Sequence, residues 1–123
     1  MIAYTTQRTQ FGKVIAGHQL VQELIADTAV EVDCARLLTW RVADLKTRGE
    51  DYSLAASKAK YYASEASVRA ANNCVQAHGG YGYIDEYPAG KYLRDARVTT
   101  LYEGTSQIQK LIIGRALTGI SAF

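Results

Sequence analysis

Two long stretches without glycine or proline constrain the fold more than any other feature of this sequence. Glycine is absent from residues 18–48 and again from residues 50–78, and the single proline, Pro88, lies outside both stretches. Since glycine and proline are the residues that most disfavour a helix interior, each stretch can form a helix of several turns. The sequence therefore predicts two long helices, the first of which ends at Gly49.

The first stretch has one apolar face. Its apolar positions recur at steps of three and four residues, as they do along one side of an α-helix. With a rise of 1.5 Å per residue, such a helix is about 45 Å long. Charged residues such as Arg36, Arg41 and Asp44 fall on the other side, which suits contact with water. The predicted apolar stripe comprises Val21, Leu24, Ile25, Thr28, Val32, Ala35, Leu38, Val42 and Leu45.

Small residues line one side of the second stretch, where they allow a neighbouring helix to approach closely. This helix is expected to start after Asp51, because an aspartate there can accept hydrogen bonds from free backbone N–H groups. It is expected to run to about His78, where Gly79 and Gly80 stop it. The small residues are Ala56, Ala59, Ala63, Ala66 and Ala70.

The rest of the chain predicts shorter elements. Residues 79–104 are expected to form loops and one short helix, and residues 2–8 resemble the end of a helix. A last helix is expected to begin near Ser106, because Ser106 and Gln109 form a capping-box pattern. No alternating run predicts a sheet, so the predicted fold is all-α, an antiparallel up-and-down four-helix bundle. The buried stripe of the last helix is predicted to be Ile108, Leu111, Ile112 and Ala116.

Composition and charge exclude several classes of protein. Of 123 residues, 48% are hydrophobic and 21% are charged, which suits one globular domain. The net charge is only +2 and no basic stripe is present, which argues against an RNA-binding bundle. Cys34 and Cys74 lack the spacing of metal ligands, so we expect reduced core residues and no metal site. Without a secretory signal or a long apolar run, a soluble protein of a reducing compartment is expected.

The first of four clusters that could carry chemistry begins at Arg8. Arg8, Gln10 and Phe11 precede Gly12, and Gln19 follows a few residues later. A charged residue, an aromatic ring and a glycine between a helix and a loop could hold a phosphate and cover a planar ring. The alternative is a solvated arginine and a phenylalanine of the core.

The second cluster lies where the second long helix is predicted to end. Gln76, Ala77 and His78 are followed by Gly79 and Gly80. Paired glycines let a ligand or another backbone come close, and their open amides can bind anions. The alternative is a helix that ends at glycine and is followed by a turn, with His78 as a structural residue.

The third cluster consists of Glu86-Tyr87-Pro88 and Arg94-Asp95-Ala96-Arg97. Arginine and aspartate so close together are typical of an ion-paired network at the surface. We interpret this cluster as structural.

The fourth cluster centres on Glu103, which stands just before the last predicted helix and is followed at once by Gly104. A base at this position can reach into a cleft, because the glycine leaves room beside it. Backbone amides at a helix start, together with Thr105 and Ser106, can donate hydrogen bonds to a ligand. The alternative is that Glu103 only complements the helix dipole.

The order of these four motifs along the chain resembles the C-terminal helical domain of the acyl-CoA dehydrogenases, from about Ile2 to Ala116. The phrase Tyr-Glu-Gly-Thr-Ser at residues 102–106, with Gln109 downstream, carries most of the resemblance. The resemblance implies an FAD-dependent oxidoreductase that removes the α and β hydrogens of acyl-CoA thioesters in fatty-acid or branched-chain metabolism. It also implies an electron-transferring flavoprotein as partner and a homo-oligomer. The base at the loop position is similar to that of short- and medium-chain enzymes.

The resemblance also assigns roles to residues. Glu103 matches the catalytic base, and Tyr102 and Gly104 are expected to border the substrate. Residues expected to contact FAD are Arg8, Gln10 and Phe11 across a subunit boundary, Gln19, Gln76, Ala77, His78, Gly79 and Gly80 at the adenosine and pyrophosphate end, and Thr105, Ser106 and Gln107 after the base.

Family members have an N-terminal helical domain and a middle β domain before this one. We expect residues 1–123 to be the C-terminal domain with those two domains absent, to bind FAD poorly and to self-associate. A cytoplasmic location in a bacterium or a mitochondrial matrix location is expected. The competing hypothesis is a non-catalytic helical oligomerisation module derived from the family.

Overall fold

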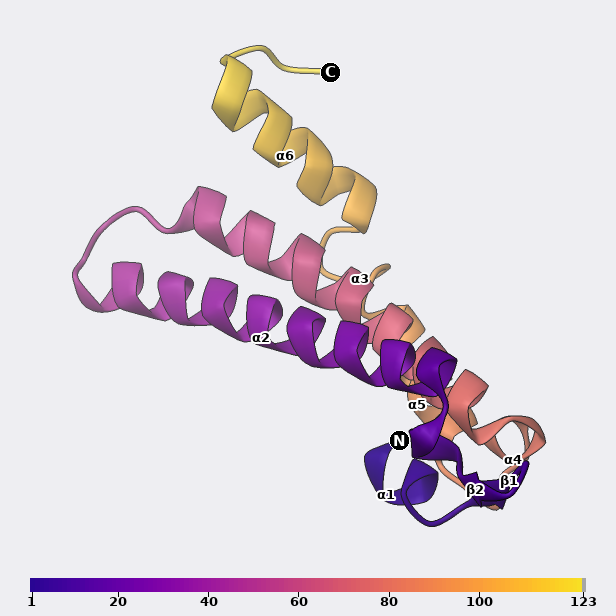
Figure 1. Cartoon of the computed structure of the whole chain (residues 1–123). Coiled ribbons are helices and arrows are strands. Elements are labelled where there is room, and N and C mark those ends of the chain that lie inside the picture. Colours follow the sequence, from indigo (N-terminus) through magenta and orange to yellow (C-terminus); the bar gives the residue numbers. More distant parts are fainter. Residues whose placement is uncertain (123) are drawn as a thin grey trace.

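Residues 1–122 are described by a computed structural model, which is predominantly helical (Figure 1). The helix-rich fold predicted from the sequence is confirmed. A two-stranded antiparallel hairpin near the N-terminus, which pairs Thr9 with Val14 and Gln10 with Lys13, was not predicted, because two-residue strands leave no alternating pattern. The elements are α1 (Ile2–Thr5), β1 (Thr9–Gln10), β2 (Lys13–Val14), the 3₁₀ helix η1 (Ile15–Gly17), α2 (Gln19–Thr47), α3 (Ser53–His78), α4 (Gly80–Tyr83), α5 (Ala89–Val98) and α6 (Ser106–Thr118).

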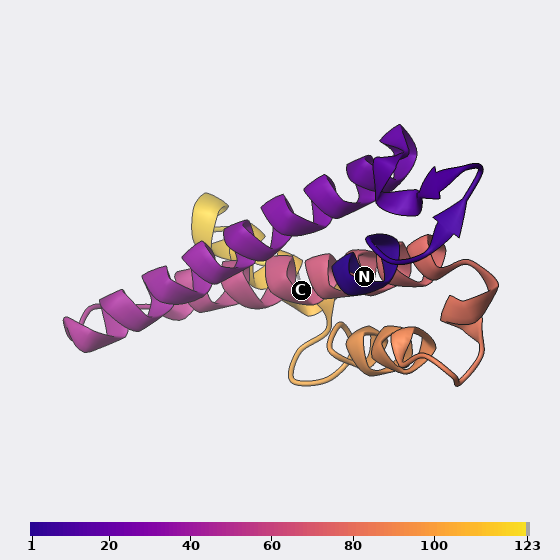
Figure 2. The same ribbon diagram turned by 60° about the horizontal axis from the view of Figure 1, so that its bottom comes forward.

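The two long helices form an antiparallel hairpin, with α2 and α3 side by side in both ribbon views (Figures 1 and 2). Gly49 ends the first helix at a φ of 72°, and its N–H donates to the carbonyl of Lys46. Hydrogen bonding by the Ser53 side chain, together with a 2.9 Å hydrogen bond from the Ser53 N–H, lowers the pKa of the Asp51 carboxyl. The predicted end of α2 and both predicted ends of α3 are confirmed, because they depend on local capping and breaking residues.

The predicted apolar stripe of α2 lies against the rest of the fold. Eight of its nine positions are half-buried, and only Val32 differs, being 43% exposed. The neighbouring Glu31 and Cys34 are half-buried instead. The stripe therefore follows the predicted helical period but is shifted by one residue at its centre.

The centre of the fold is α3, against which α2, α5 and α6 all pack. Apart from His78 at its end, its buried positions carry small side chains, which lets three helices approach one axis. Ala59 and Ala66 are buried as predicted, and Ala56, Ala63 and Ala70 are half-buried. The buried side chains of α3 are Ser57, Ala59, Ser64, Ala66, Ala71, Ala77 and His78.

The prediction for the face of α6 was wrong. Ile108, Ile112 and Ala116 are exposed and Leu111 is only half-buried. The helix lies at an angle to the α2–α3 hairpin, and its far end stands apart from it (Figure 1). Its buried residues are Ser106 and Gln109, at the end that meets α3.

The predicted capping box at Ser106 was also wrong. Thr105 is the N-cap of α6, and its hydroxyl accepts a 3.3 Å hydrogen bond from the Ile108 N–H. The hydroxyl of Ser106 donates instead to Glu65 of α3, at 2.6 Å. The Ser106 hydroxyl thus pairs with a residue of another helix instead of with the backbone of α6, which is the partner that the sequence pattern predicts.

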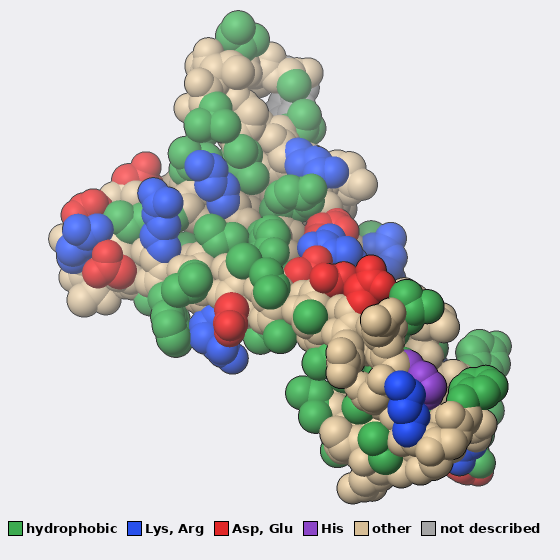
Figure 3. Space-filling model, viewed as in Figure 1, with side chains coloured by type: hydrophobic (Ala, Val, Ile, Leu, Met, Phe, Trp, Pro, Cys, Tyr) green, Lys and Arg blue, Asp and Glu red, His purple; other side chains and the backbone are tan. Residues whose placement is uncertain are grey.

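Apolar side chains remain uncovered on the outer surface of α2. Leu20 is 75% exposed, and Val30, Leu37 and Trp40 are each more than 60% exposed. Figure 3 shows hydrophobic side chains on the surface over α2 and α6. No helix in residues 1–122 combines the length and apolar character needed to cross a membrane, and no group of three or more metal-ligating side chains lies within that range. The two cysteines, Cys34 and Cys74, are free and half-buried.

The close packing around α3 generates a stability prediction. Ala66→Leu should lower the free energy of unfolding by about 1–3 kcal/mol, because Ala66 is only 4% exposed and extra volume there must displace a neighbouring helix. Ala29→Leu, on the exposed side of α2, is the matched control and should change it by less than about 0.5 kcal/mol. Urea unfolding followed by circular dichroism measures both, and equal stability of the two variants would contradict the prediction.

Candidate functional site

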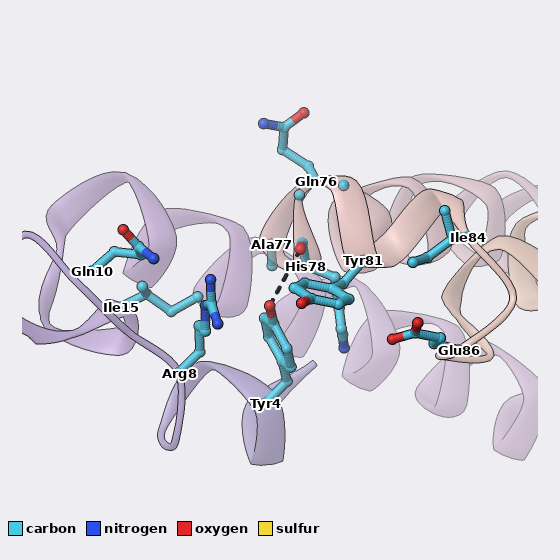
Figure 4. A pocket seen from close by; sticks show the side chains of 12 residues that line it. Tyr4, Arg8, Gln10, Ile15, Gln76, Ala77, His78, Tyr81, Ile84 and Glu86 are labelled. Atoms are coloured by element: carbon cyan, nitrogen blue, oxygen red, sulfur yellow. Dashed lines mark hydrogen bonds between the residues drawn. The ribbon is translucent and has the colours of Figure 1, made fainter.

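A cavity of about 730 Å³ lies where the C-terminal end of α3 meets the N-terminal segments and α4. Its volume falls in the range typical of small-molecule sites. Figure 4 shows side chains from α1, the β1–β2 hairpin and the end of α3 around it. Arg8 and Gln10 of the first predicted cluster therefore meet residues 76–80 of the second. The lining residues are Tyr4, Arg8, Gln10, Ile15, Gln76, Ala77, His78, Gly79, Gly80, Tyr81, Ile84 and Glu86.

Arg8 supplies the positive charge of this cavity. Its guanidinium carbon lies 5.5 Å from the centre of the Tyr81 ring, a cation–π contact that orients the side chain. The Arg8 carbonyl accepts a 2.8 Å hydrogen bond from the Ile15 N–H, which fixes its backbone across the hairpin. Glu86 also lines the cavity, so its wall carries one charge of each sign. Within residues 1–122, Arg8 pairs with no carboxylate.

Aromatic rings form part of the cavity wall. The rings of Tyr4 and His78 stack with centres 4.2 Å apart, and Tyr87 meets both at an angle. The Nδ1–H of His78 donates to the carbonyl of Cys74 at 2.7 Å, and the side chain is almost fully buried. These contacts make His78 part of the wall, as the structural interpretation of this residue predicts.

Two of the lining residues are glycines with open space beside them. Gly79 ends α3 at a φ of 60°, and a Cβ atom on either Gly79 or Gly80 would meet nothing within 4 Å. Gly82 has a different role, since a Cβ there would lie 2.4 Å from the Val75 carbonyl oxygen. The open backbone at residues 79 and 80, with Arg8 opposite, fits an anionic group such as a diphosphate.

The loop between α5 and α6 forms a second, separate place of interest. Glu103 has a φ of 52° and Gly104 a φ of 89°, so a left-handed backbone continues over two residues. A glutamate in this region is strained, and such strain is concentrated at functional sites. The Glu103 side chain is exposed, and within residues 1–122 its backbone N–H donates to no other group.

One chain does not bring these two places together. The Glu103 loop contacts Lys60 of α3, whereas the cavity is built around His78, eighteen positions further along that helix. At 1.5 Å per residue, about 27 Å separates them along the axis. The positioning of Glu103 beside Arg8 and Gln76 would therefore require a second copy of the chain.

Other predicted site residues take varied positions. Phe11 is 92% exposed at the tip of the β1–β2 turn, so the alternative of a core phenylalanine was wrong. Gln19 begins α2, outside the cavity lining, and its side chain is exposed. Ser106 is buried against Glu65, whereas Gln107 is exposed.

Tyr102 and most residues of the third cluster lie at the surface. Tyr102 is 49% exposed in the Glu103 loop. In the third cluster Asp95 pairs with Lys91, raising the pKa of that ammonium group, and Arg94 lies 3.8 Å from Asp85. The cluster is ion-paired at the surface, as expected, but its members pair with Lys91 and Asp85 outside the cluster and not with one another.

Sequence reasoning missed several residues of both places. Tyr4, Tyr81 and Ile15 line the cavity, and Lys60 holds the Glu103 loop. The tyrosine-rich character of residues 81–87 was a usable signal for Tyr81. No local pattern marks Lys60, because its partners are 39 and 44 residues away in the chain.

Comparisons with known proteins agree on one family. A family model described as acyl-CoA dehydrogenase, C-terminal domain, matches residues 1–118. An acyl-CoA dehydrogenase of Bacillus subtilis is 48% identical over 96% of this chain. A caffeyl-CoA reductase–Etf complex subunit of Acetobacterium woodii is 45% identical over 94% of it. The structure of butyryl-CoA dehydrogenase from Megasphaera elsdenii superposes with a TM-score of 0.92 at 38% identity over 94% of this chain and 30% of that one. The chain spans 31% of the length of each of the first two relatives.

Alanine substitutions at the two glycines of α4 are expected to have different effects on stability. Gly82→Ala should lower the free energy of unfolding by about 1–3 kcal/mol, because the new methyl group collides with the backbone of Val75. Gly80→Ala should leave stability unchanged or raise it by up to about 1 kcal/mol, because the site is open and its φ is ordinary. Thermal denaturation compares the two, and a Gly80→Ala variant that is the less stable would contradict this account.

Proposed function

The chain belongs to the acyl-CoA dehydrogenase family as its C-terminal domain, and we propose that this domain supplies the base that removes the α proton of an acyl-CoA thioester. The observation that carries the proposal is the backbone at Glu103, whose φ of 52° sets an exposed carboxylate on a strained turn beside Gly104. A residue that only complemented the dipole of α6 would need no such strain.

Glu103 can act on the thioester through two groups. Its carboxylate is the proton acceptor, and because the α proton of a thioester is weakly acidic, the base must be aimed closely and kept from water. Its backbone N–H is free among the described residues and can donate to the thioester oxygen as negative charge develops there. Tyr102 and Gly104 would border the acyl chain.

The residues around the cavity fit the diphosphate and adenosine end of FAD. Arg8 can donate two parallel hydrogen bonds to diphosphate oxygens, and the open backbone at Gly79 and Gly80 leaves room for them. Phe11, uncovered at its turn, can lie on a planar ring of the flavin bound in a neighbouring subunit. Bound FAD would supply the acceptor for the β hydrogen, which leaves as hydride.

The remaining proposed contacts extend this site. Gln10, Gln76, Ala77 and His78 line the cavity, and Gln19 lies at the start of α2. Thr105, Ser106 and Gln107 follow the base at the start of α6. Of these, Ser106 is engaged with Glu65, so its contribution would be to hold α6 in place.

The separation of the two places supports a homo-oligomer. Since about 27 Å of α3 lies between them, Glu103 of one copy and Arg8 of the same copy would serve different active sites. The uncovered Leu37 and Trp40 of α2 provide apolar surface for such an assembly. We propose an acyl-CoA substrate of short to medium length and an electron-transferring flavoprotein as the electron acceptor.

Replacement of the base gives the direct test. This chain is joined to the preceding two-thirds of the Bacillus subtilis relative, in place of the segment it matches. Glu103→Gln in this chimera should lower kcat with butyryl-CoA by about 10²–10⁴-fold while FAD content stays unchanged, because only proton removal is lost. Glu50→Gln, at the exposed connection between α2 and α3, is the control and should keep full activity. An unimpaired Glu103→Gln chimera would exclude Glu103 as the base.

The isolated chain should bind flavin weakly. Its cavity holds one part of the proposed FAD site, and the base lies far from it in the same copy. Titration of the purified chain with FAD, followed by fluorescence, should show no saturable binding at micromolar concentrations. Butyryl-CoA should then cause no bleaching of the flavin absorbance. Stoichiometric binding with rapid bleaching would refute this expectation.

A further inference from the structure

Lys60 of α3 reaches into the loop that carries Glu103. Its Nζ donates hydrogen bonds to the carbonyl oxygens of Thr99, at 2.8 Å, and Gly104, at 2.7 Å. The same nitrogen lies 6.0 Å from the centre of the Tyr102 ring. One side chain therefore contacts the beginning, the middle and the end of the loop.

The partners of Lys60 explain why an ammonium group suits this place. Thr99 is the C-cap of α5, and carbonyls at a helix C-terminus carry partial negative charge. Among the described residues no carboxylate lies within ion-pair distance of Lys60, which is half-buried. The contact is therefore one of directed hydrogen bonds to the backbone, and such bonds determine where the loop lies.

Gln109 of α6 holds the loop from another side. It is 8% exposed, and its Nε2 lies 3.5 Å from the carbonyl oxygen of Glu103 and 3.4 Å from that of Gly104. A Cβ atom at Gly104 would come within 2.7 Å of this nitrogen, so the fit is close. The strained backbone of Glu103 thus lies in a loop held by side chains from two helices.

We propose that Lys60 is a positioning residue for Glu103. Its two hydrogen bonds hold the left-handed turn at residues 103 and 104, which presents the Glu103 carboxylate and N–H in one place. The role rests on the proposed function of Glu103 as the base, and the experiments below separate the two.

The first experiment examines the loop in the full chain by NMR. Lys60→Met keeps most of the aliphatic stem but removes the donors. Lys58→Met is the control, because Lys58 is also half-buried but its side chain makes no hydrogen bond or ion pair within residues 1–122. In the wild type, a strong intraresidue amide–Hα NOE at Glu103 reports its positive φ. Lys60→Met should weaken this NOE and speed exchange of the Ser106 amide, which donates to Thr100 across the loop, by about tenfold.

Two further variants separate positioning from general stability. Ala66→Leu weakens packing elsewhere on α3 and should keep the NOE at Glu103. Lys60→Arg keeps a charged donor and should retain it too. A Lys60→Met chain with the wild-type NOE and Ser106 exchange would overturn the proposal. If Lys60→Met does not fold, Lys60→Leu, which also lacks a donor, is measured by the same criteria.

The second experiment uses the chimera with butyryl-CoA. Lys60→Met should lower kcat by about tenfold or more, with KM and FAD content nearly unchanged, because a misplaced base slows proton transfer without weakening binding. Wild-type kcat in Lys60→Met, alongside an inactive Glu103→Gln chimera, would overturn the positioning role alone. Full activity in Glu103→Gln would overturn the base itself, whatever the NMR shows.

Discussion

The close packing of helices around α3 is the constraint on which the rest of the structure depends. Small side chains such as Ala59 and Ala66 leave room for α2, α5 and α6 on different sides of one helix. Because protein interiors pack densely, these positions tolerate little added volume. The same helix then carries residues of both candidate places, Lys60 in its N-terminal third and His78 at its end, and so sets the distance between them.

Under the proposed function, that distance determines which parts of a flavin site one copy of the domain can supply. The cavity at the end of α3 offers a cation, open glycine backbone and an aromatic wall, which together suit the anionic and planar parts of a dinucleotide. The loop of Glu103 offers a carboxylate on a strained turn, and an N–H that has no acceptor among residues 1–122. Each place supplies groups that the other lacks, and uncovered apolar side chains on α2 and α6 provide surface through which copies can associate.

Local patterns predicted the long helices and the start of the last helix well, but the cap and the buried face of the last helix poorly, and the reason is physical. The ends of α2 and α3 are set by Gly49, Asp51 and Gly79, which act on backbone groups a few residues away. Two neighbouring residues, Thr105 and Ser106, could each cap α6. Thr105 is the N-cap, because the Ser106 hydroxyl donates its hydrogen bond to Glu65, which is distant in sequence. The exposed face of α6 likewise follows from the angle at which it meets α3, which its own periodicity does not contain.

The sequence by itself determined where the long helices end, most of the stripe that α2 turns toward the rest of the fold and the motif that identifies the family around Glu103, because each depends on residues close together in the chain. Only the tertiary structure decided that Arg8 meets residues 76–80, that Lys60 and Gln109 hold the Glu103 loop, and that these two places lie apart on α3. Those relations join residues from different helices. They depend on how side chains fill the interior and how buried polar groups find hydrogen-bond partners across the whole fold. Patterns of neighbouring residues in the sequence do not contain this information.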